Sequence, residues 1–501
     1  MMYIQTADCT PFTIMLVSLF LILITWYVYS WYKFMQHLPR FPGIVLPIIG
    51  NNYKCHYHKN GEDLKLVQDQ RKLNSDGYTV YSFGITHITV TDFKLLNEVF
   101  VTHASKSSHR PLFSQLTSDT PMKKGIASSN GRLWHLHRKE TQIAFSKLGL
   151  GVSFLEIQTS LEASAMVDYL IKIKKPTNMK LMKNFFAAAA SNMIFQLCFG
   201  KRFDYRDVRF LQILSDIEIL LETIKLDSRY QFPKWIRNMS LKFKKEVDNS
   251  RRAIINLKGF VSEQIAFYHS EFNDETIVGS LRKKQNSQDD HLSDDHIVES
   301  CIEYLLAGTE TISVTMTWFV HFFINHPDIQ QKVKNEVIHV LDGRKAMYGD
   351  ISSMPILHAC ILETLRFGST AAVSLLHKVS EDIYTSQGYI FPKNSVISGS
   401  LFAIMRDKSV FKYPDHFDLR NFLADDLTIL KQANFIPFSI GPRVCAGEKL
   451  ARLELFIFAA NFVQNFAVSP IEGKAPEDDV AQMAFTRSPL DYEFFLTNEP
   501  L

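Results

Sequence analysis

The sequence predicts a chain that combines long helices with a β-hairpin, preceded by a single N-terminal transmembrane helix. Three observations lead to this prediction: an uncharged run from Phe12 to Tyr32, a long helical pattern from Ser293 to about Asn325, and two short strand-like runs between Thr79 and Thr91. The length of 501 residues allows either several domains or one large domain.

The N-terminal run is long enough to cross a bilayer, because about 21 uncharged residues form a helix of sufficient length. Aromatic residues crowd its C-terminal end, Lys33 and Arg40 follow, and no Lys or Arg precedes it, which predicts that the rest of the chain is cytosolic. A secretory signal peptide would have basic residues before a shorter apolar core, whereas here Asp8 precedes the run. We predict residues 1–32 as luminal tail and anchor, 33–50 as a proline-containing hinge and 51–501 as the globular domain.

The charge balance and the cysteines exclude some classes of protein. The 55 Lys and Arg residues nearly balance the 52 Asp and Glu residues, and the net charge of +3 predicts no nucleic-acid partner. The cysteines are scattered without a C-x-x-C pair, which indicates a reducing compartment rather than a disulfide scaffold or a zinc site. They are Cys9, Cys55, Cys198, Cys301, Cys360 and Cys445.

Two segments after the anchor carry clear local signals. Leu38 to Gly43 contains two prolines and a glycine, which stiffen the chain and end regular structure. The runs Thr79 to Gly84 and His87 to Thr91 surround a glycine-containing turn, so we predict a β-hairpin.

The middle of the chain predicts a helix, a break and a second helix between Phe203 and Arg252, with the break at Phe232 to Ile236. Gln285 to Asp295 is polar and acidic and predicts a surface linker. Ser293, followed by two aspartates, predicts the N-cap of the longest helix in the chain.

A glycine lies near the centre of that helix, within Leu306 to Thr311. Glycine in a helix interior costs about 1 kcal/mol relative to alanine, so Gly308 needs a reason. One reason is that Thr311 can donate to the carbonyl of Ala307, which bends the helix and opens a groove. The alternative is that Gly308 is needed only for packing.

A turn-rich loop from Phe438 to Gly447 precedes a helical pattern that starts near Leu450. This places Cys445 just before a helix N-terminus, where unpaired N–H groups lower the pKa of a thiol and favour the thiolate, a good metal ligand. Taken alone, Cys445 is as well explained by a half-buried cysteine at a helix start.

Five residues of the loop add weight to the metal-ligand reading. Gly441 and Gly447 would let the backbone approach a large planar ligand, Phe438 would shield the sulfur from water, and Arg443 would pair with an anionic group. With Cys445 they match the pattern Phe-x-x-Gly-x-Arg-x-Cys-x-Gly, for which a chance match is on the order of one in ten thousand.

The chain thereby resembles the cytochrome P-450 haem-thiolate monooxygenases, most closely the animal microsomal branch. The resemblance spans about Pro39 to the C-terminus and implies one large, mainly α-helical catalytic domain with small β-sheets, the cytochrome P-450 fold. It also implies haem b as cofactor, with Cys445 as the ligand of the iron.

The resemblance assigns further residues to the haem propionates. Trp134 and Arg138 match the family's Trp-x-x-x-Arg motif, although such a pair is otherwise more often stacked on a surface. Arg110 lies where relatives place another propionate-binding arginine. His377 does the same at the end of an apolar, strand-like segment that starts at Ala371 and lines the substrate pocket in relatives.

The resemblance also gives roles to the long helix. Ala307 and Gly308 would border the groove that binds dioxygen, and Glu310 and Thr311 would organise protons and water for catalysis. The paired helices between Phe203 and Arg252 would roof the substrate pocket, with their connecting loop near the membrane.

Glu363 and Arg366 match the family's Glu-x-x-Arg motif, a buried structural ion pair that needs a third polar partner. Relatives supply this partner from a Pro-Glu-Arg-Phe sequence, but the corresponding stretch here begins at Leu419 and reads Leu-Arg-Asn-Phe. Arg420, Asn421 and His416 therefore all stay open as the partner.

By resemblance the activity is insertion of one oxygen atom of O2 into a lipophilic substrate, which could be a sterol, a fatty acid or a foreign compound. The chain has no flavin or dinucleotide fingerprint, so the electrons would come from NADPH through NADPH-cytochrome P-450 reductase, with cytochrome b5 as a second donor. The expected location is the endoplasmic reticulum membrane, crossed once, with the catalytic domain cytosolic. Basic residues predict a docking face for the reductase: Arg132, His135, His137, Lys139, Lys449 and Arg452.

Two other functions stay open. A haem-thiolate isomerase or dehydratase rearranges peroxides without a reductase, but such enzymes typically lack an acid and alcohol pair like Glu310 and Thr311. A non-enzymatic membrane haem carrier or sensor needs neither this pair nor electrons. Dependence of turnover on NADPH and reductase distinguishes the three.

Overall fold

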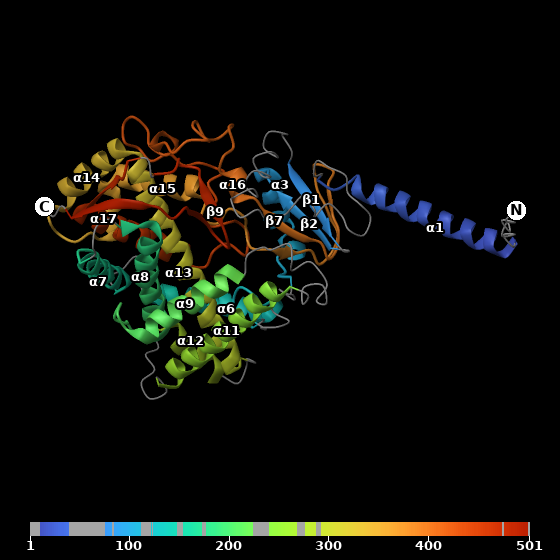
Figure 1. Ribbon diagram of the computed structural model, residues 1–501, viewed down its shortest axis with the longest axis horizontal. Helices are drawn as coiled ribbons and strands as arrows, with labels where there is room; N and C mark the ends of the chain where they lie inside the picture. Colours follow the sequence, from blue (N-terminus) through green and yellow to red (C-terminus); the bar gives the residue numbers. More distant parts are fainter. Residues whose placement is uncertain are drawn as a thin grey trace, which may run out of the picture.

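The computed structural model describes residues 11–39, 76–82, 85–111, 122, 124–147, 154–172, 177–223, 240–267, 276–286, 292–472 and 475–498. Helix α1 (Pro11–Met35) projects from one side of a mainly helical body that carries several small sheets (Figure 1). The predicted fold class is therefore confirmed. The loop around Phe232 and the hinge residues after Pro39 lie outside the described residues.

Helix α1 contains a segment, Thr13–Lys33, that is long and apolar enough to cross a membrane, and none of it is buried against the rest of the protein. The chain joins the body directly after α1. Leu38 is 2% exposed in an apolar cluster, the Ile390 amide donates to the His37 carbonyl at 2.9 Å, and the Thr79 hydroxyl donates to the Pro39 carbonyl. The described part of the predicted hinge is thus packed and hydrogen-bonded.

The largest sheet has the strand order β1, β2, β7, β4. Strands β1 (Gly77–Ser82) and β2 (Ile85–Val90) form an antiparallel hairpin, as predicted, with Ser82 opposite Ile85. Strand β7 (Val396–Gly399) pairs in parallel with β2, and β4 (His377–Lys378) pairs antiparallel with β7.

The strand-like prediction for residues 371–376 is wrong. These residues are irregular and the sheet begins at His377, so this histidine opens a strand instead of closing one. The physical reason is that residues 371–376 turn their apolar side chains to a cavity and not to a neighbouring strand.

Helix α13 (Asp294–Asn325) is the longest in the described chain and passes through the body, where it packs most extensively on α8 (Met179–Phe199) (Figure 1). It starts after Ser293, whose amide donates to the His296 ring at 2.8 Å, and acidic residues fill its first turn, as the sequence predicts. Helix α14 (Pro327–Leu341) follows directly, with its proline in the first turn.

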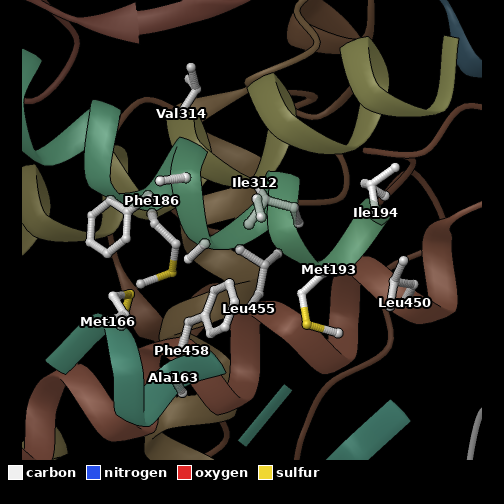
Figure 2. Close-up of a cluster of buried hydrophobic side chains, with 14 of the residues drawn as sticks. Ala163, Met166, Phe186, Met193, Ile194, Ile312, Val314, Leu450, Leu455 and Phe458 are labelled. Atoms are coloured by element: carbon white, nitrogen blue, oxygen red, sulfur yellow. The ribbon is translucent and has the colours of Figure 1, made fainter. Parts of the chain in front are cut away.

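Four of the helices that contribute to the main core meet near its centre. They are α7 (Phe154–Leu170), α8, α13 and α17 (Glu448–Asn465). Figure 2 shows apolar side chains from all four interdigitating: Ala163, Met166, Phe186, Met193, Ile194, Ile312, Val314, Leu450, Leu455 and Phe458. Fully buried side chains of this size each contribute about 1.5–3 kcal/mol, so this core fixes the positions of α13 and α17.

The predicted helix pair appears as α9 (Val208–Thr223) and α11 (Leu241–Phe267), which pack on each other. The predicted linker is partly wrong, since Gln285 and Asn286 end helix α12 (Ile277–Asn286). Polar residues are common at the end of a surface helix as well as in a loop, so the sequence does not separate the two.

The remaining elements complete the body. Short helices and turns are α3 (Phe93–Asn97), η2 (Glu98–Thr102), α4 (Ala104–Ser107), α6 (Gly131–Lys147), η5 (Tyr348–Ser353), α15 (Pro355–Gly368), α16 (Leu401–Ile404) and η6 (Leu419–Asn421). Further strands form three small sheets: β5 (Ile383–Tyr384) with β6 (Ile390–Phe391), β9 (Ala481–Met483) with β10 (Arg487–Pro489), and β3 (Thr177–Asn178), β11 (Glu493–Asn498) and β8 (Phe466–Pro470).

Candidate active site

A cavity of about 570 Å³, bordered by α6, α13 and the start of α17, lies within the body. Three irregular segments, residues 369–376, 437–447 and 484–486, complete its wall. Most of the side chains that line it are apolar, and its volume is usual for a small-molecule site. The predicted site residues on its wall are Arg110, Trp134, Arg138, Ala307, Gly308, Thr311, His377, Phe438, Arg443, Cys445 and Gly447.

The loop that carries Cys445 is folded back on itself. The Cys445 amide donates to the Phe438 carbonyl at 3.0 Å, and the Val444 amide donates to the Gly441 carbonyl at 3.0 Å. Gly447 is the residue before α17, as the sequence predicts. A Cβ added at Gly447 would meet no atom within 4 Å, so the chain leaves free space beside the thiol.

Gly441 serves a purpose that the sequence does not reveal. Its φ of 80° lies in the left-handed region, and a Cβ there would come within 2.3 Å of the Phe100 carbonyl oxygen. This glycine is therefore required by the contact between the loop and η2.

The thiol of Cys445 lies deep in the protein but is open to the cavity. Burial raises its pKa, and the Gly447 amide and the Arg138 charge oppose this only in part. Without a bound cation, the cost of burying the thiolate therefore exceeds the help it receives from the Gly447 amide and Arg138. A bound metal cation would reverse the balance, since a coordinating thiol is deprotonated.

Cationic groups gather at one side of the cavity. Burial, followed by the charges of Arg110 and Arg138, lowers the pKa of Arg443 to about 9. Burial lowers the pKa of Arg110 to about 10, and burial together with the Arg110 charge lowers the pKa of His377. Each of these positive charges disfavours the ionised form of the others. An anionic ligand between them would relieve this repulsion, so we predict one there.

The structure shows which of these donors are already used. Arg443 donates to the Ser108 and Ser129 carbonyls at 3.0 and 2.9 Å, so it holds backbone instead of offering all its donors to an anion. Arg110 donates to the Leu375 and Leu376 carbonyls at 3.2 and 2.7 Å, and its buried Nε has no partner.

Other donors face the cavity unused. Within the described residues, neither the Trp134 indole N–H nor the Arg138 guanidinium makes a hydrogen bond, and both side chains line the cavity. His377 uses only Nδ1, at 2.9 Å from the Ser107 carbonyl oxygen, and its ring stacks on Phe100. Free donors, surplus positive charge and an accessible thiol together fit an acidic, planar, metal-containing cofactor such as haem.

The central residues of α13 point in two directions. The Thr311 hydroxyl donates to the Ala307 carbonyl at 2.7 Å, as predicted, and both residues line the cavity. A Cβ at Gly308 would come within 2.4 Å of Ile194 on α8, so this glycine is also required for helix packing. Glu310 is buried and is not among the described residues that line the cavity. Lys183 donates to its carboxylate at 2.9 Å.

Comparison with known proteins decides between the readings of this site. The sequence profile of the family described as Cytochrome P450 matches residues 39–496. The chain belongs to the cytochrome P450 family. This P450 is a monooxygenase with haem iron as its cofactor, and it takes a lipophilic substrate and electrons from a redox partner.

Named mammalian and avian P450s are similar over nearly the whole chain. Cytochrome P450 2J2 of Homo sapiens is 28% identical over 446 residues, which cover 85% of this chain and 84% of the relative. Cytochrome P450 2B9 of Mus musculus is 28% identical over 478 residues, covering 92% and 93%. Cytochrome P450 2H2 of Gallus gallus is 28% identical over 469 residues, covering 90% and 91%.

The Glu363 and Arg366 side chains of this P450 form a two-contact ion pair at 2.7 Å, away from the cavity and fully buried. Asn421 is the third partner, because its amide donates to Glu363 at 3.0 Å. His416 contributes only its backbone carbonyl, which accepts from Arg366 at 2.8 Å. Arg420 is exposed and pairs with Asp418, so it is not the partner.

Only some of the basic residues predicted to form the docking face of this P450 are exposed. His137 is 0% exposed and lies near Ser300 inside the body, so its inclusion is wrong. His137 lies on the inner side of α6, between the half-buried residues Leu136 and Arg138, and its basic side chain alone does not reveal this. Arg452 is half-buried and pairs with Glu448 at 2.9 Å. The exposed members are Arg132, His135, Lys139 and Lys449.

Sequence reasoning does not single out two cavity residues of this P450, the buried carboxyl groups Glu303 and Glu454. The family resemblance assigns Phe485–Thr486 to the pocket lining, and the buried Thr486 hydroxyl does lie on the cavity wall. Glu303, Ala307 and Thr311 are spaced four residues apart, which puts them on one face of a helix. This spacing could have indicated that Glu303 lines the cavity. Burial raises the pKa of Glu454 well above its usual range. No local signal marks Glu454.

Proposed function

We propose that this P450 inserts one oxygen atom of O2 into a lipophilic substrate with electrons from NADPH, delivered by the flavoprotein NADPH-cytochrome P-450 reductase. The supporting observation is that Cys445 and Thr311 line one mainly apolar cavity, which can hold both a cofactor and an apolar substrate. The substrate class stays that of lipophiles: sterols, fatty acids or foreign compounds.

The cofactor is proposed to be haem b, held by this chain's own donors. Trp134, Arg138, Arg110 and His377 would bind its acidic groups, and Cys445 would supply the thiolate ligand. Bound haem supplies the redox chemistry that activates O2. Phe438, beside Cys445 on the cavity wall, would exclude water from the sulfur.

The distal residues would handle protons. The Thr311 hydroxyl donates a hydrogen bond to the Ala307 carbonyl, so its oxygen is available to the cavity as an acceptor. Glu310 would act as the acid that supplies protons.

Membrane and partner assignments follow the anchor and the exposed charges. Helix α1 would cross the endoplasmic reticulum membrane once, with the catalytic domain in the cytosol. The exposed basic residues Arg132, His135, Lys139 and Lys449 would receive the acidic reductase, and cytochrome b5 would be a second donor on the same face.

The test reconstitutes the full-length haem protein with reductase in vesicles and screens lipophiles by the Soret shift that accompanies binding. Each binder is then incubated with NADPH and reductase, with NADPH alone, and with an organic hydroperoxide alone. Product that requires both NADPH and reductase supports the proposal. Rearrangement of the hydroperoxide without NADPH would instead indicate an isomerase or dehydratase, and binding without any turnover a carrier or sensor.

A further inference from the structure

Glu310 and Thr311 are neighbours in sequence but not partners in space. Successive helix residues are about 100° apart around the axis, so one can face a cavity while the next faces a neighbouring helix. Thr311 lines the cavity, whereas the Glu310 carboxylate is 7% exposed and bonded to Lys183 of α8. Among the described residues no hydrogen bond joins the Glu310 and Thr311 side chains, so the acid has no direct contact with the alcohol beside it.

A different hydroxyl connects Glu310 with the cavity. Thr486 lies on the cavity wall, and its Oγ1 donates to Glu310 Oε1 at 2.8 Å. The same oxygen, Glu310 Oε1, also accepts from Lys183 Nζ at 2.9 Å, and the Lys183 side chain is 24% exposed and therefore reaches solvent. Lys183, Glu310 and Thr486 thus form one hydrogen-bonded line from the protein surface to the cavity.

The backbone around Thr486 holds this hydroxyl in place. The Thr486 carbonyl accepts from the Ala484 amide at 2.9 Å, and the next amide, of Arg487, donates to the Thr370 carbonyl at 2.9 Å. The fully buried Arg487 side chain also donates to the Gly368 carbonyl and to Asp479, at 2.8 and 2.6 Å. A side chain anchored in this way presents its hydroxyl in a fixed direction.

We propose that Thr486 is the hydroxyl through which Glu310 exchanges protons with the cavity. This inference rests on the proposed role of Glu310 as the acid. When the carboxyl group is protonated, its O–H donates to Thr486 Oγ1, and the Thr486 O–H turns to donate to a water molecule in the cavity. One proton arrives at the threonine oxygen as one leaves, so Thr486 stays neutral, and solvent water at the Lys183 end reprotonates the carboxylate.

The test compares Thr486→Val, which keeps the shape but loses the hydroxyl, with Thr486→Ser, which keeps the hydroxyl. Full-length holoenzyme is reconstituted with reductase, and hydrogen peroxide released per NADPH is measured without added substrate. A broken proton route lets reduced oxygen leave as peroxide, so we expect this ratio to rise several-fold in Thr486→Val, with the wild-type ratio in Thr486→Ser. Thr486→Ala is a second hydroxyl-free variant should the valine protein fail to bind haem.

A double-mutant cycle separates this inference from the role of Glu310. If both residues share one route, Glu310→Gln and Thr486→Val combined release no more peroxide than either alone. An unchanged ratio in Glu310→Gln would overturn the proposed role of the acid itself. A raised ratio in Glu310→Gln with a wild-type ratio in Thr486→Val would overturn only the inference about Thr486, as would equal effects of valine and serine.

A readout without turnover checks the contact itself. The infrared bands of the Glu310 carboxyl group are obtained as the difference between spectra of the holoenzyme and its Glu310→Gln variant. Removing a hydrogen-bond donor changes the carboxyl stretching frequencies, so Thr486→Val should shift these bands and Thr486→Ser should leave them in place. Unshifted bands in Thr486→Val would contradict the proposal.

Discussion

The guanidinium group of Arg443 lies over the ring of Trp134, with its central carbon 3.9 Å from the ring centroid. This contact joins the Cys445 loop to α6. The same guanidinium also donates to the Ser108 and Ser129 carbonyls, so one side chain fixes three parts of the cavity wall.

We predict that Arg443→Lys weakens the hold on the cofactor. Lysine cannot make the planar, multiple contacts of a guanidinium, so haem should transfer to an apomyoglobin acceptor about tenfold faster than from the wild type. The transfer is followed by absorbance. Lys139→Ala, at an exposed position on α6, is the control and should leave the rate unchanged. Equal rates in Arg443→Lys and wild type would show that the contact does not retain the cofactor.

The proposed role of Cys445 has a spectroscopic signature. Only a thiolate ligand gives the reduced carbon monoxide complex its strongly red-shifted Soret band, because a neutral thiol or an imidazole donates less charge to iron. Cys445→Ala should lose this band and all oxygenation. Cys301 and Cys360 are fully buried, so their alanine variants are the controls and should keep both. Survival of the band without Cys445 would refute the assignment.

Glu303 predicts a pH dependence of stability. Burial, the largest cause, raises its pKa from 4.5 to about 7, although the Ala127 amide donates to it at 2.6 Å. Between pH 4.5 and about 7 the folded protein therefore holds a proton that the unfolded chain has released. The free energy of unfolding then falls as the pH rises through this window.

Glu303→Gln removes this titration and keeps an oxygen that accepts from Ala127. We expect the profile of Tm against pH to be flatter for this variant than for the wild type over the same window, measured by circular dichroism. Glu299, whose charge also raises the pKa of Glu303, is present in both proteins and does not account for the difference. Parallel profiles would mean that Glu303 does not titrate in this range.

Gly308 and Ile194 predict a packing effect between α13 and α8. An alanine at Gly308 would place its Cβ 2.4 Å from the Ile194 side chain, so Gly308→Ala should reduce the free energy of unfolding by about 1–3 kcal/mol. Adding Ile194→Ala makes room for the new methyl group. The double variant should therefore be more stable than the sum of the two single changes predicts, as measured by chemical denaturation. Simple additivity would contradict the contact.

The sequence predicts elements whose signals are local. Ser293 and the acidic residues after it locate the start of α13, and the glycine-containing turn locates the β1–β2 hairpin. The bond from Thr311 to the Ala307 carbonyl is also local, since it spans one helical turn. Such features depend on neighbours within a few residues, which the sequence displays directly.

Features that depend on distant residues could not be predicted. The direction of Glu310 is set by Lys183 and Thr486, which lie 127 and 176 residues away along the chain. Burial of Cys445 depends on the whole body and reverses the direction of its pKa shift. Among the three candidates for the Glu363 network, only the folded chain shows that Asn421 reaches the carboxylate.

The short connection after α1 predicts different results for two truncations. Removing residues 1–32 should release the protein from membranes and leave haem binding intact, because the contacts of His37, Leu38 and Pro39 with the body stay. Removing residues 1–39 also deletes Leu38, which is 2% exposed, and should lower the Tm by several degrees. The measurements are membrane sedimentation, haem content and thermal unfolding. Loss of haem in the shorter truncation would show that the anchor is not separable.

The fixed residues at the end of α1 also bear on how the enzyme is oriented. Because His37 and Pro39 are hydrogen-bonded to the body and Leu38 is packed in it, the described chain leaves little rotational freedom between anchor and catalytic domain. An apolar helix changes its tilt when the bilayer becomes thinner or thicker. Here such a change would rotate the whole domain relative to the lipid surface, so membrane thickness would set which face of the enzyme meets the lipid and which meets its electron donor.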